Sequence, residues 1–230
     1  MKKTFLFIVC YLFAAAYGQG SGKALNFDGS GYIGVPSFSF DNRDFAVSMW
    51  ATNGGVGSGQ IENLWGSGYT GGNQDVEFVI LDNGTPYMQV RDASFSIVAV
   101  STTTRVDDGA WHHLVFMRQG NVFSMYVDGN LSGSATRALG DVDATGAQAR
   151  IGDLSLLTGR RLTGRLDEVR VWSRALSQDE IRHKMTERLT GTEPGLVAYY
   201  RMDEGTDNTC PGGQDVCDAS GNGNHGVKFY

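Results

Sequence analysis

The fold is decided at residues 164–181, which read GRLDEVRVWSRALSQDEI and change their period halfway. In the first half, alternation places Asp167, Val169 and Val171 on one face, as in a β-strand whose one side lies against a core. In the second half, Ser177 and Glu180 have the S-x-x-E spacing of a helix capping box. The stretch therefore predicts a strand that leads directly into a short helix.

Short strand-like runs fill most of the remaining chain. Between residues 24 and 172 they are separated by Gly, Asn and Asp, which are common turn formers. We expect strands at 24–27, 32–35, 45–52, 60–66, 77–81, 85–91, 96–101, 111–119, 122–127, 148–151, 164–172 and 196–202, and a helix at 178–188. The pattern predicts an all-β fold, a jelly-roll β-sandwich of two antiparallel sheets with one short C-terminal helix.

Residues 1–18 have the features of a secretory signal peptide. Lys2 and Lys3 precede an apolar run over residues 4–16, and small residues follow up to Gly18. Neither this run nor any later one reaches the roughly 20 apolar residues of a membrane-spanning helix. We therefore predict a secreted, extracellular protein with no membrane span and one β-sandwich domain over residues 19–230.

The chain is acidic. Its formal net charge is −6, and loss of the two lysines in residues 1–18 changes this value to −8. No basic run is present in the sequence, which argues against nucleic acid and anionic membranes as partners. The acidic balance is compatible with cation binding.

Two cysteines, Cys210 and Cys217, lie outside the predicted signal peptide. In an oxidising compartment they predict a disulfide that closes a small loop. A metal site is the alternative, but the pair lacks the second cysteine pair of a zinc ribbon. Residues 203–230 around them are rich in Gly, Asn and Asp, so we expect a loop-rich tail.

Several motifs, taken together, resemble one family. They are ALNFDG at residues 24–29, WHH at 111–113, YVDG at 126–129 and DEVRVW at 167–172. With them the chain resembles the laminin-G-like jelly roll of the concanavalin A-like lectin/glucanase superfamily, to which pentraxins are related. The resemblance covers nearly all of residues 19–230, and the motifs occur in the expected order.

The resemblance implies a structural calcium ion. In related lectins and glucanases, an N-terminal residue and an aspartate on a late strand often share this ion, and the matching residues here are Asp28 and Asp167. The alternative is that Asp28 caps the turn at Gly29, while Asp167 pairs with an arginine or with backbone N–H groups. The adjacent His112 and His113 point to opposite faces of their strand, so they cannot chelate one metal ion.

The sequence argues against catalysis. Retaining glycosidases need two carboxyl groups that face each other, and glucanases of this superfamily carry an E-x-D-x-x-E cluster for that purpose. Here Asp167 and Glu168 are neighbours on a strand and point apart, and the pair Asp75 and Glu77 lacks a third acid. No G-x-S-x-G motif is present either. We therefore interpret the protein as a non-enzyme.

The resemblance favours a lectin-like or adhesion module that recognises a glycan or a cell-surface or matrix glycoprotein. Tyr69, in the Gly-rich loop of residues 65–74, is the candidate sugar platform because an aromatic ring beside amides and hydroxyls suits a sugar. Asn83 and Asn130 lie in N-x-S/T sequons on predicted turns and are candidate glycosylation sites. The alternatives are a divergent glycan hydrolase or lyase, and a pentraxin-like oligomeric structural protein.

Overall fold

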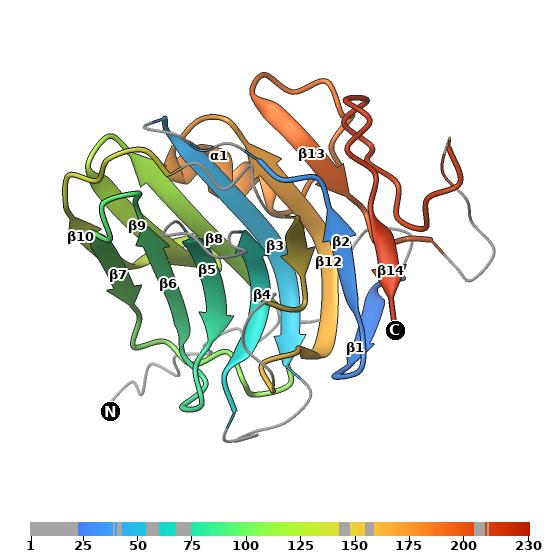
Figure 1. Ribbon diagram of the computed structural model, residues 1–230, viewed down its shortest axis with the longest axis horizontal. Coiled ribbons are helices and arrows are strands. Elements are labelled where there is room, and N and C mark those ends of the chain that lie inside the picture. The colour runs from blue at the N-terminus through green and yellow to red at the C-terminus, as the bar shows by residue number, and fades with distance from the viewer. Residues whose placement is uncertain are drawn as a thin grey trace, which may run out of the picture.

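The computed structural model is a sandwich of two antiparallel β-sheets with one short helix against one of them (Figure 1). It describes residues 23–38, 40, 43–53, 60–67, 75–142, 148–154, 159–204, 210 and 212–230. The predicted fold class is confirmed, while the predicted signal peptide lies outside these residues. None of the helical residues within these ranges forms a helix of the length and apolarity that crossing a membrane requires.

Each sheet has seven strands. The spatial order in sheet A is β1 (Leu25–Asp28), β12 (Thr163–Trp172), β3 (Phe45–Asn53), β8 (His112–Gln119), β9 (Val122–Val127) and β10 (Asn130–Thr136), and β13 (Leu196–Tyr200) also pairs with β12. The order in sheet B is β14 (Val227–Phe229), β2 (Tyr32–Val35), β11 (Ala149–Ile151), β4 (Glu62–Ser67), β5 (Asp75–Ile80), β6 (Pro86–Arg91) and β7 (Ile97–Ser101). The sequence did not predict β10 or β14, because β10 has no buried residue and β14 is only three residues long.

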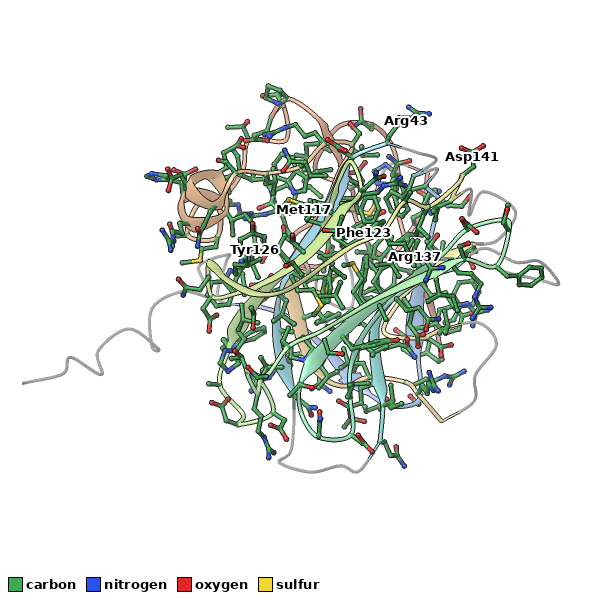
Figure 2. All side chains as sticks on the ribbon, turned by 90° about the vertical axis from the view of Figure 1, so that its left-hand side faces the viewer. Arg43, Met117, Phe123, Tyr126, Arg137 and Asp141 are labelled. Atoms are coloured by element: carbon green, nitrogen blue, oxygen red, sulfur yellow. A yellow bond between two sulfur atoms is a disulfide. The ribbon has the colours of Figure 1, made fainter. Side chains whose placement is uncertain are left out.

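The main core lies between the two sheets. Phe78 of sheet B stacks on Phe116 of sheet A with ring centroids 4.3 Å apart, and both rings are fully buried. Phe123 of β9 points into the same interior, as Figure 2 shows. Burial of an aromatic or aliphatic side chain of this size contributes about 1.5–3 kcal/mol relative to exposure, so the inter-sheet core supplies most of the stabilisation.

Strands β10 and β7 bring the two sheets together at one edge. A Cβ atom on Gly133 of β10 would lie 2.4 Å from the carbonyl oxygen of Ser101 in β7, so only glycine allows this approach. Arg137, just after β10, donates from Nη1 to the carbonyl oxygen of Ile97 at 2.7 Å (Figure 2). The sandwich is therefore closed along this edge by direct contact between β10 and β7.

Strand β12 contains a bulge that reverses one of the predicted orientations. Glu168 has a φ of 51°, and the register between β12 and β3 shifts between Asp167 and Arg170. As a result Leu166 and Val169 both face the inter-sheet core, while Asp167 lies opposite Trp50 on the outer face of sheet A. The prediction that Asp167 faces the core is wrong, because simple alternation does not count the extra residue of a bulge.

The predicted capping box is present at the start of helix α1 (Gln178–Lys184). The Ser177 hydroxyl accepts from the Glu180 N–H, and the Glu180 carboxylate accepts from the Ser177 N–H. The helix is shorter than the predicted 178–188. It packs on the outer face of sheet A through a second apolar cluster that includes Ile181, Trp172 and Met117.

Arg170 joins the end of this helix to sheet A. Its side chain is fully buried, and its guanidinium donates to the carbonyl oxygens of Lys184 and Glu187. It also pairs with the Glu168 carboxylate, which accepts a further hydrogen bond from the Tyr199 hydroxyl. A cation is favourable at the C-terminal end of a helix, so Arg170 stabilises α1 as well as its contact with the sheet.

The tail after β13 is closed on itself by a disulfide and is held to the sheet by Asp218. Cys210 and Cys217 form the predicted disulfide. The Asp218 carboxylate accepts from the backbone N–H of Tyr199 in β13 and from that of Ser220, both at 2.9 Å. From there the chain returns to sheet B as β14, which pairs with β2.

We expect Arg170→Met to destabilise the protein by about 3–5 kcal/mol, because it leaves the Glu168 carboxylate buried without its cation. The double variant Arg170→Met/Glu168→Leu should recover part of this loss, because it removes the stranded charge as well. The free energy of unfolding from urea denaturation measures both effects. A double variant that is no more stable than Arg170→Met would contradict this account.

Candidate functional site

The two outer faces of the sandwich differ in what covers them. Helix α1 and its apolar cluster lie on the outer face of sheet A, with Met117 and Tyr126 directed toward the helix (Figure 2). On the outer face of sheet B, the outward residues of β6 are polar or charged and partly exposed, whereas those of β4 and β5, among them Asn63 and Glu77, are buried. This second face is therefore the candidate functional surface.

Strand β6 contributes a stripe of three outward side chains, Tyr87, Gln89 and Arg91. Its buried residues, among them Met88 and Val90, point into the core, so alternation turns these three outward, where each is half-buried. The Tyr87 hydroxyl donates to Gln89 Oε1 at 3.2 Å. We call these three residues the β6 stripe.

An ion pair lies beside the β6 stripe. Glu77 of β5 is opposite Gln89 in the register, and its carboxylate pairs with Arg160 Nη1 at 2.9 Å. The carbonyl oxygen of Arg160 accepts from both the backbone and the side-chain N–H groups of Asn63. The segment around Arg160 is thus fixed on the face of sheet B, and the Glu77 carboxylate is engaged by a cation.

An aromatic ring flanked by two arginines forms the other part of this face. Tyr32 of β2 stacks on Phe229 of β14 with centroids 4.8 Å apart, and the Arg150 guanidinium lies 4.2 Å from the Tyr32 ring centroid. Arg150 Nη1 pairs with Asp153 at 2.9 Å, and Arg161 Nε approaches the same Asp153 oxygen at 3.7 Å. We call these five residues the Tyr32 platform.

The two residues predicted to share calcium do not lie together. Asp28 is opposite Thr163 in the register of β1 and β12, and Thr163 is four residues from Asp167. At about 3.3 Å per residue they are separated by about 13 Å along the strand, too far for one ion with Ca–O distances near 2.4 Å. No group of three or more His, Cys, Asp or Glu side chains that could hold a metal occurs in the described part of the chain.

Both aspartates instead match the alternative interpretation. Asp28 Oδ1 accepts from the N–H and the hydroxyl of Ser30, and these hydrogen bonds lower the pKa of Asp28. Asp167 Oδ1 accepts from the Glu168 N–H at 2.9 Å. Asp28 and Asp167 therefore do not fit a shared calcium site. Calcium is assigned no part in the geometry of the outer face of sheet B.

Two buried carboxyl groups have perturbed acidity. Burial, reinforced by the neighbouring charge of Glu168, raises the pKa of Asp167 to about 7. Burial also raises the pKa of Glu62 to about 7, and one of its carboxylate oxygens has no hydrogen-bond partner. The sequence analysis missed Glu62, because a single acid at the start of an apolar strand carries no local signal of burial.

The two histidines do not form a catalytic or metal-binding pair. His112 lies between Asp128 and Asp108, at 2.8 and 3.1 Å, and the hydrogen bond to Asp128 is the main cause that raises its pKa. His113 is buried on the other face of β8 against Trp50, and burial lowers its pKa to about 3. Their contacts agree with the structural interpretation.

The other predicted residues have three different outcomes. Tyr69 lies outside the described residues. Asn83 is exposed, and its Oδ1 accepts from the N–H and hydroxyl of Thr85. Asn130 is also exposed, but its Nδ2 donates to the Asp128 carbonyl oxygen and its Oδ1 accepts from Arg182. Glycosylation therefore stays a prediction at both sites. The side-chain nitrogen that would carry the glycan is free at Asn83 and hydrogen-bonded at Asn130, so Asn83 is the more accessible site.

The raised pKa values predict a pH-dependent stability. For Glu62 and Asp167 the folded pKa exceeds the unfolded one, so their contribution is complete below the unfolded pKa and is lost as the pH rises through about 7. Glu62→Gln and Asp167→Asn remove the charge. As the pH rises from about 5 to about 8, the free energy of unfolding of each variant should therefore increase relative to that of wild type by on the order of 1–2 kcal/mol. Melting temperature measured against pH checks this.

The exposed turn residue Asp82 provides the control for these variants. Asp82→Asn removes a carboxylate from a surface turn and serves as the reference for the loss of one negative charge. A difference between Glu62→Gln and wild type that does not change with pH would contradict the prediction.

Similar folds occur in several carbohydrate-related proteins. A proposed carbohydrate-binding protein from Bacteroides ovatus has a TM-score of 0.69 and 20% identity, over 90% of this chain and 58% of that one. Domain 4 of the extracellular arabinanase AbnA from Geobacillus stearothermophilus, solved with arabinotriose, has a TM-score of 0.56 and 19% identity, over 71% and 76%. The CBM40 of the Ruminococcus gnavus IT-sialidase has a TM-score of 0.58 and 13% identity, over 71% and 96%.

At these identities the structural matches establish the fold alone. This chain spans 58% of the length of the Bacteroides ovatus protein. A comparison with curated proteins finds no relative that matches the sequence. Residues 27–182 match the family model Laminin_G_3, and the chain therefore belongs to the concanavalin A-like lectin/glucanases superfamily.

Proposed function

We propose that this chain is a secreted, non-catalytic glycan-binding module whose binding surface is the outer face of sheet B. One observation carries the proposal: the β6 stripe places the Tyr87 side chain beside the Gln89 amide, with Arg91 further along the same strand, on a face that no helix of the described residues covers. A sugar has C–H patches ringed by hydroxyl groups, so it needs an apolar ring face with hydrogen-bonding groups beside it.

The comparisons support the same class of ligand. AbnA domain 4 was solved with arabinotriose, and the Bacteroides ovatus and Ruminococcus gnavus proteins carry carbohydrate-binding descriptions. Superfamily membership alone does not choose between binding and hydrolysis, because one fold hosts several functions. The chemistry of the candidate site has to make that choice.

The carboxylates on and near this face favour binding over catalysis. Glu77 is held by Arg160 and is nearly buried, Glu62 is buried below the surface, and Asp167 lies away from this face, on the outer face of sheet A. A glycosidase needs a free nucleophile or base and a second carboxyl group across the scissile bond. Among the described side chains of sheet B, Glu77 is therefore a structural partner of Arg160 in this proposal rather than a nucleophile.

The glycan-binding surface is tested by substitutions in the β6 stripe. We expect Tyr87→Ala and Gln89→Ala each to weaken binding on a glycan array about tenfold, because each removes roughly 1 kcal/mol of ring contact or hydrogen bonding. Gln119→Ala, at the exposed end of β8 in sheet A, is the matched control and should bind like wild type. Unchanged binding by both β6 variants would place the glycan site elsewhere, with Tyr69 as the next residue to substitute.

Calcium is proposed here only as a structural ion that stabilises the fold, and it is tested separately from glycan binding. A bound ion should stabilise wild type by RT ln(1 + c/Kd), where c is the calcium concentration, so its melting temperature should rise with the logarithm of c above Kd. Asp28→Ala and Asp167→Ala each show whether one of these residues ligates the ion. The same calcium-induced rise in all three proteins would exclude both residues as ligands, and no rise in wild type would remove calcium from the proposal.

The competing functions have their own tests. Release of reducing ends from a bound glycan would favour the hydrolase alternative, and an unsaturated product would favour a lyase. Native mass measurement separates a monomer from a ring-like assembly. These outcomes leave the position of the glycan surface unaffected.

A further inference from the structure

The Tyr32 platform holds a guanidinium in a fixed orientation. The Arg150 guanidinium lies over the Tyr32 ring at 4.2 Å, and the Phe229 ring stacks on Tyr32 with planes 12° apart. The Arg150 Nη1 contact to Asp153 fixes the remaining rotation of this side chain. A cation over an aromatic face is favourable, so Arg150 is oriented before any ligand arrives.

The platform carries more positive than negative charge. Arg150 and Arg161 both approach Asp153, which leaves a formal charge of +1 for these three groups. Arg105, Arg174 and Arg188 differ, because each of them pairs with an acid of its own. This local excess stands out in a chain whose net charge is −6.

The two arginine side chains are more exposed to solvent than the carboxylate with which they pair. The Asp153 side chain is 6% exposed, whereas the Arg150 and Arg161 side chains are 22% and 40% exposed. An approaching molecule therefore meets guanidinium N–H groups first. A guanidinium presents its donors in a planar fork that matches a carboxylate in a bidentate manner.

An apolar edge adjoins these donors. Phe229 is 38% exposed, and Tyr230, the next residue, is 95% exposed. Carboxylate recognition beside an aromatic edge suits a sugar ring that carries an acidic substituent, because the C–H face of the ring covers the aromatic edge while the acid reaches the guanidinium.

We propose that the Tyr32 platform binds the carboxylate of an acidic sugar, with Arg150 as the anion-binding residue and Arg161 as the second cation. This inference rests on the proposed glycan-binding function and adds a ligand class to it. The β6 stripe contacts the neutral part of the glycan, while the platform selects for negative charge. Sulfated sugars carry the same negative charge on a tetrahedral group, so the test includes them.

The test compares an oligogalacturonate with its methyl ester, which has the same size and no charge. Wild type should bind the acid at least about tenfold more tightly than the ester, because charge-assisted hydrogen bonds contribute roughly 1.5–3 kcal/mol. Arg150→Gln should abolish this preference. Arg150→Lys should lose most of it as well, because lysine keeps the charge but not the fork.

Two further variants, one control outside the platform and one change within it, separate the platform from general effects of charge. Arg182→Gln removes one positive charge from the helix side of the molecule and should keep the preference for the acid. Tyr32→Leu removes the ring beneath Arg150 and should weaken binding of the acid. Loss of the preference in Arg182→Gln to the same extent as in Arg150→Gln would overturn the proposal.

The outcomes also separate this inference from the proposed function. Equal binding of acid and ester would overturn the inference but leave the glycan-binding function in place. Binding of a sulfated oligosaccharide in preference to the oligogalacturonate, lost in Arg150→Gln, would keep the anion site and overturn the choice of carboxylate. If wild type binds no glycan on the array, the glycan-binding function itself is rejected.

A second measurement does not depend on finding the right oligosaccharide. Monomeric galacturonate should shift the NMR signals of the Arg150 guanidinium and the Tyr32 ring, and galactose at the same concentration should not. The galacturonate shifts should weaken as salt is added, because both partners are charged and partly exposed. No shift with galacturonate, or equal shifts with both sugars, would overturn the proposal.

Discussion

The burial of Arg170 is the constraint on which the arrangement of sheet A and its helix depends. A guanidinium is costly to bury unless acceptors surround it, and here they come from the adjacent Glu168 and from the carbonyl groups at the end of α1. A helix of seven residues is unstable alone in water, and its capping box covers only the first turn. Arg170 supplies what the last turn lacks. The helix therefore exists because β12 holds it.

The same contact explains the bulge in β12 and the difference between the two faces. Glu168 can reach Arg170 and Tyr199 only because its backbone adopts a left-handed conformation, which turns Asp167 and Arg170 to the outer side of sheet A. Local strain of this kind persists where the surrounding contacts determine it strongly. The outer face of sheet A is thereby committed to packing against α1. Any extended ligand surface on the sheets must then use the outer face of sheet B, where the polar side chains gather.

Those parts of the molecule that depend on local periodicity could be predicted from the sequence. The capping box at Ser177 and Glu180, the alternation in β6 and the close cysteine pair all involve residues within a few positions of one another. The orientation of Asp167 could not be predicted, because alternation misses an inserted residue. The expected meeting of Asp28 and Asp167 failed for a related reason, since the register between β1 and β12 is set by contacts along both strands and no motif records it.

The two parts of the proposed binding face differ in the same way, because one depends on a single strand and the other on long-range pairing. The β6 stripe lies on one strand, so any sequence that keeps the alternation of β6 keeps its geometry. The Tyr32 platform takes residues from β2, β11, β14 and the segment around Arg161, which meet only through long-range pairing. Its Phe229 ring depends on the return of the tail to β2, which the Asp218 contact to Tyr199 and the Cys210–Cys217 disulfide support. The tail thus contributes to the core through Val216 and to the proposed binding face through Phe229, and changes at Phe229 can alter ligand preference while the sandwich stays intact.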